Sequence, residues 1–299
     1  MSSSPELLRV PVADDADAIA ALADVRRPLD AREIRAWLAN PTFDPANDFR
    51  VLDRGGAIVG YLDVHREGDR LSVDLVSRDG DASRVLLDWA DERARAQGIG
   101  HLVTSAWEGG DVRNAVLRAH GYTPYRNSLE MQMPLDDSTP EPSWPAGVDV
   151  RTVRAHEERE VHALLDEVFA DQHDFAPTPF EEWAAWWDGD RKRLDLWFAA
   201  EGDGALAGVA LLEAEHAGSP GLGWVESLGV RRSWRGQGLG RALLLHSFRA
   251  LRGLGRTAVG LSVQEHNPTG AVRLYESVGM STVRVRVRYE KHLTRSRLA

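Results

Sequence analysis

The sequence predicts an α/β fold made of two tandem domains, each a mixed, mostly antiparallel sheet flanked by helices. Three observations support this fold class. The chain of 299 residues is long enough for two domains of about 150 residues each. Its 43% hydrophobic residues suffice for buried cores. Strand-like and helix-like segments also follow one another in the same order in both halves.

In the first half, a strand-like segment at residues 7–13 precedes a helix-like segment at residues 14–25, which begins with aspartate and has apolar residues at helical spacing. Residues 48–64 predict two strands joined by an Arg-Gly-Gly turn. Residues 77–122 predict a helix that ends in glycine, a strand and a short helix. A last strand is expected to follow.

The second half repeats this order. Residues 148–154 predict a strand, and residues 155–170 predict an amphipathic helix. Two strands around a Glu-Gly-Asp-Gly turn follow at residues 194–214. Residues 234–280 predict a glycine-ended helix, a strand and a short helix, and a last strand is expected again.

The two halves are interpreted as copies of one ancestral unit. Gly98 aligns with Gly255, and Gly121 aligns with Gly279 after a shift of one residue. A repeat at a spacing near half the chain length indicates duplication.

A segment with four prolines and no apolar periodicity, residues 133–149, separates the copies and predicts a linker. We therefore expect an N-terminal domain at residues 1–137, a linker at 138–147 and a C-terminal domain at 148–299.

Composition limits the classes of function. The net charge of −10 argues against a general nucleic-acid-binding protein, and it favours either simple solubility or attraction of a cationic substrate. The sequence contains no run of about 18 apolar residues, so it predicts no membrane span. Its N-terminal residues do not have the pattern of a secretory signal. The absence of cysteine excludes thiol catalysis by the chain and fits a reducing cytoplasm. We expect a cytoplasmic monomer or homodimer without a metal or a membrane or nucleic-acid partner.

A glycine-rich turn lies between the strand-like residues 224–230 and a helix-like segment. Backbone N–H groups at a helix N-terminus have no partner within the helix, and glycines let several of them converge on one anion. The turn therefore predicts a pyrophosphate cradle, to which arginine side chains can add charge-assisted bonds. A glycine-rich turn without a ligand is the alternative. The residues assigned to this cradle are Arg235, Gly236, Gln237, Gly238, Leu239, Gly240 and Arg241.

Spacing distinguishes among phosphate-binding loops. The turn lacks the Gly-Lys-Ser/Thr of a Walker loop, and its G-x-G-x-G spacing differs from the G-x-G-x-x-G of a Rossmann loop. The order R-x-x-G-x-G, in RGQGLG, resembles the coenzyme A loop of the GNAT-type N-acetyltransferase superfamily. Residues 266–280, HNPTGAVRLYESVGM, resemble the second GNAT signature. The resemblance is strong over residues 148–292 and weaker over the first half.

This resemblance implies that acetyl-CoA is the cosubstrate and that the strand before the loop is splayed from its neighbour. Leu228, Gly229 and Val230 would then lie beside pantetheine and the acetyl group, and the Val230 N–H would stabilise the oxyanion. Tight strand packing is the alternative role of Gly229. The resemblance also assigns Asn267 to pantetheine, and we assign Ala271 to the same cofactor site.

Two further side chains are assigned to proton transfer. Tyr275, in the second signature, is the candidate acid for the departing thiolate, and a core tyrosine is the alternative. Glu226 is the candidate base, because strand alternation would place it on the same face as Leu228 and Val230. Glu265 and His266 are its rivals, and a solvated strand carboxylate is the alternative reading of Glu226.

The acceptor is expected to be the primary amine of a small molecule. Aminoglycoside-like, amino-acid and polyamine acceptors, and a protein N-terminus, stay open. Aromatic residues at helical spacing are more often core than ligand contacts. The candidates for the acceptor pocket are His173, Trp183, Trp186, Trp187 and Trp224.

The first half departs from the family at its chemical positions. Its loop, RDGDAS at residues 78–83, aligns Asp79 with Gly236, Asp81 with Gly238 and Ser83 with Gly240. Carboxylates at these positions would repel pyrophosphate. Leu117 aligns with the signature tyrosine, and Gly109 or Gly110 with the asparagine. The first half is therefore interpreted as a degenerate copy.

The tandem layout also resembles that of the mycothiol synthases, which acetylate the cysteinyl amine of a pseudo-disaccharide. The chain departs from that family at two acceptor positions, because Trp224 replaces a strand carboxylate and Ser262 replaces a tyrosine. The expected function is acetyl transfer from acetyl-CoA to a small amine in the C-terminal domain. Mycothiol synthase-like acetylation and a non-catalytic acyl-CoA-binding module are the alternatives.

Overall fold

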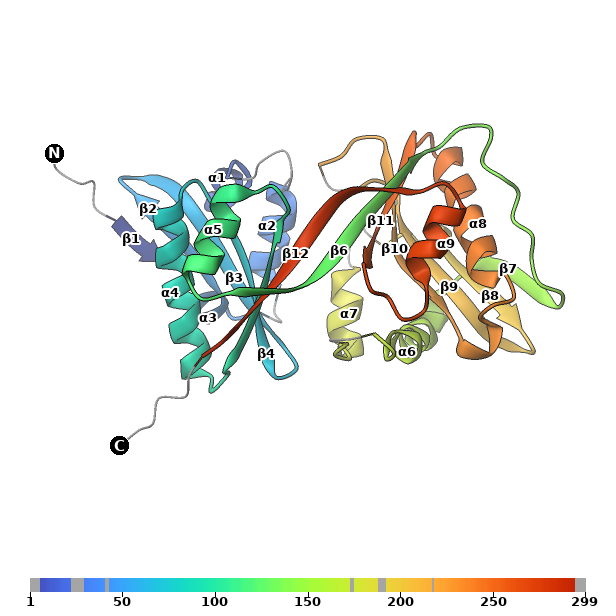
Figure 1. Ribbon diagram of the computed structural model, residues 1–299, viewed down its shortest axis with the longest axis horizontal. Helices are drawn as coiled ribbons and strands as arrows, with labels where there is room; N and C mark the ends of the chain where they lie inside the picture. The colour runs from blue at the N-terminus through green and yellow to red at the C-terminus, as the bar shows by residue number, and fades with distance from the viewer. Residues whose placement is uncertain are drawn as a thin grey trace. The chain divides into compact units, whose positions relative to one another are not determined.

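The computed structural model describes residues 6–22, 30–40, 43–172, 175–187, 192–216 and 218–293. The chain forms two compact units (Figure 1). Unit 1 comprises Met1–Ser128 and Val285–Ala299, and unit 2 comprises Leu129–Arg284. Both are mixed α/β units with sheets flanked by helices, as the sequence predicts.

Unit 1 contains a sheet in the order β1-β2-β3-β4-β5-β12. Neighbouring strands are antiparallel except for the parallel pair β4 and β5. Short turns join β2 to β3 and β3 to β4, whereas the parallel pair β4 and β5 is connected through helix α4, as a parallel crossover requires. The strands are β1 (Glu6–Arg9), β2 (Phe49–Arg54), β3 (Ala57–Glu67), β4 (Arg70–Ser77), β5 (His101–Trp107) and β12 (Ser281–His292).

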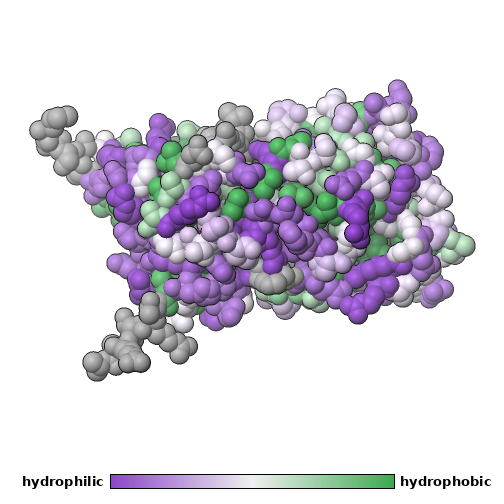
Figure 2. All heavy atoms as spheres, in the orientation of Figure 1, coloured by the Kyte–Doolittle hydropathy of each residue, from purple (hydrophilic) through white to green (hydrophobic). Residues whose placement is uncertain are grey.

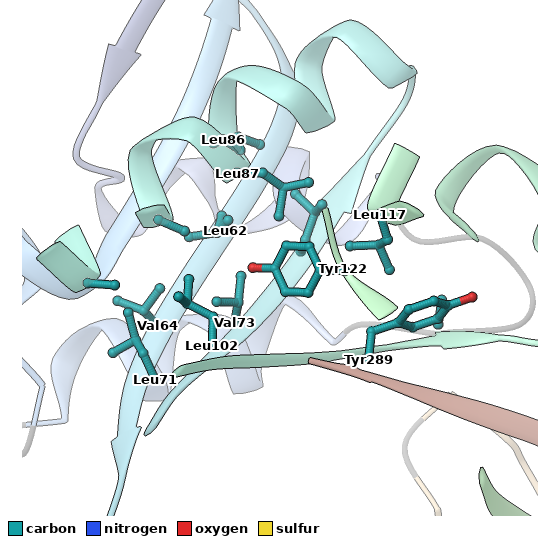
Figure 3. Close-up of a cluster of buried hydrophobic side chains, with 14 of the residues drawn as sticks. Leu62, Val64, Leu71, Val73, Leu86, Leu87, Leu102, Leu117, Tyr122 and Tyr289 are labelled. Carbon is teal, nitrogen blue, oxygen red and sulfur yellow. The ribbon is translucent and has the colours of Figure 1, made fainter. Parts of the chain in front are cut away.

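Helices cover both faces of this sheet. One face packs against α4 and α5, and their shared core includes Leu86, Leu117, Tyr122 and Tyr289 (Figure 3). The other face packs against α1 and α2. The helices are η1 (Ala13–Asp15), α1 (Ala16–Ala20), α2 (Ala31–Ala39), α3 (Pro45–Asp48), α4 (Gly80–Ala96) and α5 (Asp111–Ala119).

Unit 2 repeats this plan with the strand order β6-β11-β10-β9-β8-β7. Strands β7 to β10 are antiparallel neighbours, and β10 and β11 are parallel. The strands are β6 (Thr123–Pro134), β7 (Val148–Thr152), β8 (Trp197–Gly202), β9 (Ala205–Glu213), β10 (Leu222–Val230) and β11 (Ala258–Gln264).

The sheet of unit 2 is also covered on both faces. Helices α6 and α7 pack over one face with Trp197 and Val209. Helix α8 packs on the other face, where Gly208 and Gly223 lie closely beneath its side chains. The helices are η2 (Ala155–Glu157), α6 (Glu158–Phe169), α7 (Phe180–Trp186), η4 (Leu194–Leu196), η5 (Arg232–Trp234), α8 (Leu239–Gly253) and α9 (Ala271–Ser277).

The two halves of the sequence exchange their last strands. Strand β6 begins in unit 1, but its residues from Leu129 belong to unit 2, and the residues of β12 from Val285 belong to unit 1. The bounds predicted at 1–137 and 148–299 follow the duplicated segments, whereas the compact units follow the contacts that these two long strands make.

Residues expected to form a linker are packed along α8. Arg249 donates to the carbonyl of Thr139 and pairs with Glu141 at 2.7 Å. The rings of Trp144 and His246 meet with their centroids 5.7 Å apart. The segment therefore follows the surface of unit 2.

The face of the molecule in Figure 2 is mostly hydrophilic, with apolar side chains in small groups. No helix among the described residues is long and apolar enough to cross a membrane.

Candidate functional site

Strands β10 and β11 form a fork in unit 2. They are paired in parallel only from Leu222–Ala258 to Trp224–Gly260. Beyond this point β10 runs on to Val230 and β11 to Gln264 without further pairing between them. The edge of β10 that faces β11 is thus left with backbone groups that a ligand can bind.

A β-bulge lies where the fork opens. Val225 is opposite Leu212 and Ser227 is opposite Leu211, so that Glu226 is the extra residue. A bulge breaks the alternation of side chains, so the strand-face argument for Glu226 fails. The Glu226 side chain is nevertheless exposed, and bulges re-aim side chains beside active sites.

The backbone of β10 directs two N–H groups into this fork. The N–H of Arg231 donates to Ala207 of β9 at 2.9 Å. Because strand backbone groups alternate in direction, the N–H groups of Val230 and Leu228 point away from β9, toward the open side. The Val230 carbonyl also avoids β9, since it accepts a 3.0 Å bond from Arg235 Nε.

Gly229 faces helix α6. A Cβ atom at this position would lie 2.8 Å from Cγ2 of Val168, closer than such contacts allow. Helix packing alone therefore explains why this strand position has no side chain.

The glycine turn holds two residues in the left-handed region. Gly236 has φ 76° and Gly238, the N-cap of α8, has φ 87°. No atom lies within 4 Å of where a Cβ would stand at either residue, so the turn is open on that side. The turn needs glycine for its backbone conformation rather than for packing.

The first turn of α8 is arranged for an anion. The backbone N–H groups of residues 236–241 donate no hydrogen bond to any of the described residues. The first turn contains no acidic residue, and it carries the cation Arg241, which pairs with no described residue. A cation at a helix N-terminus opposes the helix dipole unless an anion lies nearby. Buried Leu239 anchors this turn in the core.

The other arginines of the motif do not face this turn. Arg235 donates to Asp171 at 2.9 Å and to the Val168 carbonyl at 3.3 Å. Arg232 pairs with Asp171 at 2.5 Å, and Arg231 pairs with Glu167 at 3.2 Å. These three side chains tie the turn to the C-terminal end of α6. The Arg235 guanidinium is therefore engaged by the protein, and it was expected to bind pyrophosphate.

Asp171 completes this anchor. The Arg235 guanidinium holds the pKa of the Asp171 carboxyl below its usual value, and Arg232 adds to the effect. The sequence gives no signal for this contact, because Asp171 lies 64 residues before Arg235. The side chain of Gln237 also stays within the loop, where it donates to the Ser233 carbonyl at 2.8 Å.

Gly240 is the point where three elements meet. A Cβ here would lie 3.4 Å from Leu274 of α9 and 3.7 Å from Val230 of β10. Tyr275 follows Leu274 and is buried, with 8% of its surface exposed. Burial raises the pKa of the Tyr275 phenol to about 12. Its hydroxyl forms no hydrogen bond with the residues that the structure describes.

Asn267 shapes the entry to α9. Its Oδ1 accepts bonds from the N–H of Thr269 at 2.9 Å and from the Thr269 hydroxyl at 2.5 Å. Gly270, with φ 74°, is the N-cap, and Ala271 is the first helical residue. Asn267 thus has a turn-forming role of its own beside any contact with pantetheine.

The predicted acceptor residues are mostly core residues. Trp187 is 2% exposed and packs edge-on to Trp197 at a centroid distance of 4.9 Å. Trp224 is also buried and stacks on His216 at 4.0 Å. Trp183 is partly buried against the same core as Trp187. His173 lies outside the described residues.

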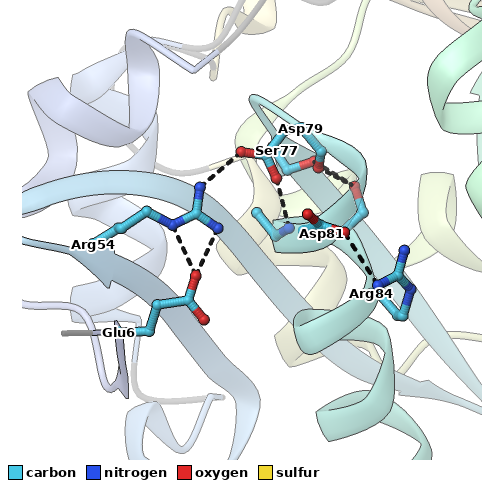
Figure 4. Close-up of polar contacts among 8 residues, drawn as sticks. Glu6, Arg54, Ser77, Asp79, Asp81 and Arg84 are labelled. Atoms are coloured by element: carbon cyan, nitrogen blue, oxygen red, sulfur yellow. Dashed lines mark hydrogen bonds and ion pairs between the residues drawn. The ribbon is translucent and has the colours of Figure 1, made fainter. Parts of the chain in front are cut away.

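The corresponding turn in unit 1 is closed by a side chain. Asp79 is the N-cap of α4, and its Oδ1 accepts a 2.7 Å bond from the Ala82 N–H. Arg54 pairs with the same carboxylate at 3.0 Å (Figure 4). The Ala82 N–H, with help from Arg54, holds the pKa of Asp79 below its usual value.

This cap changes the alignment of the two loops. Asp79 and Gly238 are both N-caps, so Asp79 replaces Gly238 and not Gly236 as the sequence alignment had it. One residue separates β4 from the cap in unit 1, and seven residues, 231–237, separate β10 from the cap in unit 2. The anion-binding loop of unit 1 is therefore shortened as well as substituted.

The alignment of Leu117 with Tyr275 is supported by matching backbone bonds. Leu117 O accepts from Tyr122 N at 3.0 Å, and Tyr275 O accepts from Met280 N at 3.1 Å. Leu117 is fully buried in the core of unit 1. No hydroxyl is therefore available at this position of the first copy.

A strand fork beside a helix N-terminus that has no capping side chain is suited to a ligand with an anionic group. Residues 159–280 match the acetyltransferase (GNAT) family. A mycothiol acetyltransferase of Thermomonospora curvata is 33% identical over 251 residues, which cover 79% of each chain. The chain belongs to the GNAT acetyltransferase family.

Solved structures agree with this assignment. A GCN5-related N-acetyltransferase from Sphaerobacter thermophilus is 29% identical, with a TM-score of 0.75 over 96% of this chain and 95% of that chain. A tandem GNAT protein from the clavulanic acid biosynthesis pathway has a TM-score of 0.76 over 98% of this chain and all of that one. Since it is only 20% identical, it supports the tandem fold alone.

Proposed function

We propose that the C-terminal copy transfers the acetyl group of acetyl-CoA to the primary amine of a small molecule by direct attack. The observation that carries this proposal is the contrast between the two helix N-termini. That of α8 has no cap side chain and carries Arg241, a cation that pairs with none of the described residues, whereas that of α4 is filled by Asp79. Converging N–H groups with an adjacent arginine are suited to pyrophosphate.

The residues at the fork are suited to binding the pantetheine arm and the acetyl group of acetyl-CoA. The N–H groups of Leu228 and Val230 point to the open side of β10 and can hold an extended amide chain and a carbonyl oxygen. The Val230 N–H is the proposed oxyanion donor, and loss of such a donor costs about 2.7–4 kcal/mol in the transition state. Asn267 and Ala271 at the start of α9 are proposed to border the pantetheine arm.

Tyr275 is proposed to protonate the leaving thiolate. When the amine attacks the thioester carbonyl, a C–N bond forms and the C–S bond breaks. The sulfur then takes a proton from the phenol, and the nitrogen of the new amide returns a proton to the phenolate through water. Burial keeps the phenol protonated, with a pKa of about 12, throughout the physiological range. The same shift makes the phenol a weaker acid than an ordinary tyrosine, so its proton transfer to the thiolate is less favourable.

Glu226 is proposed to take the proton of the attacking ammonium, through water. The bulge exposes its side chain where β10 leaves β11. Glu265 and His266 follow the end of β11, and they stay as rivals for this role. Their side chains are both exposed and 3.7 Å apart.

The names of the relatives favour one particular acceptor, a cysteinyl amine on a pseudo-disaccharide. One observation opposes it, since buried Trp224 occupies the position of that family's strand carboxylate. We therefore keep a broader class of small amines as the main proposal. A non-catalytic acyl-CoA-binding module is the remaining alternative.

A panel of amines tests these proposals. Free thiol released from acetyl-CoA is measured with amino acids, polyamines, aminoglycosides and a cysteinyl pseudo-disaccharide, each at the same concentration. Release that depends on one class of amine identifies the acceptor. Binding of acetyl-CoA without release by any amine would favour the non-catalytic module.

A further inference from the structure

The first copy retains a fork of its own. Strands β4 and β5 are paired in parallel from Arg70–His101 to Ser72–Val103 and then separate. This is the same three-pair contact that β10 and β11 make. Unit 1 therefore keeps the strand geometry of a ligand site, although its loop chemistry has changed.

Side chains of unit 1 occupy the backbone groups that an extended ligand would need. Thr104 Oγ1 donates to the Val73 carbonyl at 2.7 Å, immediately beyond the last strand pair. Arg113 of α5 donates to the Leu75 carbonyl. Together with the Asp79 cap on α4, these bonds close both the strand edge and the helix N-terminus to a coenzyme A molecule.

The fork of unit 1 nevertheless encloses a cavity of about 600 Å³. This volume falls within the range of about 300–1,000 Å³ that small-molecule sites occupy. All its lining residues belong to unit 1. They come mainly from β4, β5, the start of α4 and α5, and β12.

The lining is rich in arginine. Its cationic side chains are Arg78, Arg113, Arg286 and Arg288, and His65 also lines it. Its carboxylates are Glu67, Asp74 and Asp79.

Residues outside the lining offset part of this negative charge. Arg70 pairs with Glu67 at 3.3 Å, and Arg54 pairs with Asp79 at 3.0 Å. Within the lining, His65 Nε2 lies 3.0 Å from Glu67 Oε1. The lining thus holds four arginines and three carboxylates, and two of these carboxylates also pair with arginines from outside it. The cavity is therefore suited to an anion.

Two of these arginines point to a ligand more directly. The Nε of Arg288 is buried and has no hydrogen-bond partner among the described residues. A buried donor without a partner calls for an explanation such as a missing ion or ligand. Arg78 is exposed at the mouth, and its side chain pairs with no described residue. Arg286 lies over the ring of Trp107 at 4.4 Å, which gives the cavity an aromatic wall.

We propose that the fork of unit 1 is a binding site for a small anionic metabolite that carries a phosphate or carboxylate group. In this site Arg288 and Arg78 bind the anion, and the Trp107 ring contacts its carbon skeleton. The degenerate copy would thus have exchanged coenzyme A for a smaller ligand. The inference does not depend on the acceptor of the second copy.

Calorimetry with the full-length protein tests this site. The probes are glucose 6-phosphate, citrate and uncharged glucose, so that the first two distinguish a phosphate from a carboxylate preference. We expect binding of at least one anion and none of glucose. Arg288→Gln and Arg78→Gln should each lower the affinity for the anion about tenfold or more. Arg288→Lys, which keeps the charge, should retain part of the affinity.

Arg84→Gln is the matched control, because Arg84 is an exposed arginine of α4 that does not line the cavity. It should leave the affinity unchanged, and thermal melting should show that every variant is folded. Equal weakening by the control, or no binding of either anion at millimolar concentration, would overturn the proposal.

A Gly238→Asp variant separates this site from the coenzyme A site. It should bind the anion normally and lose acetyl-CoA. Acetyl-CoA that still binds this variant and competes with the anion would show that the fork of unit 1 is a second coenzyme A site, contrary to the proposal.

Discussion

Asp79 Oδ1 accepts a 2.7 Å hydrogen bond from the Ala82 N–H at the N-terminus of α4. The protein thereby supplies its own anion to the helix end that, in the second copy, is capped by Gly238 and left open. The residue at this cap position is thus one difference between the two copies, beside the shorter loop of unit 1.

Replacing Asp79 with asparagine or alanine tests this relationship through stability. Loss of an N-cap costs about 0.5–2 kcal/mol, so Asp79→Ala should lower the free energy of unfolding of unit 1 by that amount at pH 7. Asp81→Ala is the control, since Asp81 lies on the exposed first turn and, among the described residues, its carboxylate pairs with Arg84 alone, at 3.1 Å. Urea unfolding of the wild-type protein, the two Asp79 variants and the control gives the comparison.

The same bond predicts a pH dependence. The pKa of Asp79 is lowered in the folded state, so its ionised form stabilises the fold above the unfolded pKa near 3.9. That contribution is lost as the pH falls through the lower, folded pKa. The difference between the wild-type protein and Asp79→Asn should therefore shrink below about pH 4, and a difference that grows there would contradict the assignment.

Gly229→Ala tests whether α6 requires glycine at this strand position. The added methyl group would lie 2.8 Å from Cγ2 of Val168, and such overpacking costs typically about 1–3 kcal/mol. Val168→Ala removes the clashing atom, so the double variant should recover part of the loss. Additive losses in the double-mutant cycle would instead point to a different cause.

Tyr275→Phe should lower kcat about 100- to 10,000-fold with little change in acetyl-CoA affinity, because it removes only the hydroxyl. Since the pKa of Tyr275 is about 12, its ionisation should cause no fall in kcat below about pH 11. Steady-state rates with a fixed amine check both expectations. Near-normal turnover in the Phe variant would leave Tyr275 with a packing role only.

Glu226→Gln should reduce kcat/KM at neutral pH and recover partly at high pH. An amine with a pKa near 10 is almost wholly protonated at pH 7, so the loss of a base matters most there. Glu265→Gln is the matched control at the end of the neighbouring strand. An equal loss at every pH would assign Glu226 to substrate positioning, and no loss would transfer the base role to Glu265, His266 or solvent.

Local patterns were sufficient to predict the tandem α/β plan and the glycine turn between a strand and a helix. They did not reveal the β-bulge at Glu226, because a bulge is defined by its partners on β9. Nor did they reveal that Arg231, Arg232 and Arg235 are held by α6, since these pairs span more than 60 residues of chain.

The loop alignment shows a second limit. Matching the sequences placed Asp79 at Gly236, whereas the caps place it at Gly238. A deletion in a loop cannot be recognised from one sequence alone. In the structure, the hydrogen bonds of the first helical turn identify the N-cap residue, and the two caps can then be aligned. Aromatic residues at helical spacing were equally ambiguous, and Trp187 is a core residue.

Calorimetric titration of the full-length protein with acetyl-CoA tests the central claim most directly. We predict one binding site per chain, which disappears in Gly238→Asp because a carboxylate then occupies the strained, open cap of α8. Asp79→Asn should leave this single site intact. Two comparable sites in the wild-type protein, or undiminished binding to Gly238→Asp, would contradict the account.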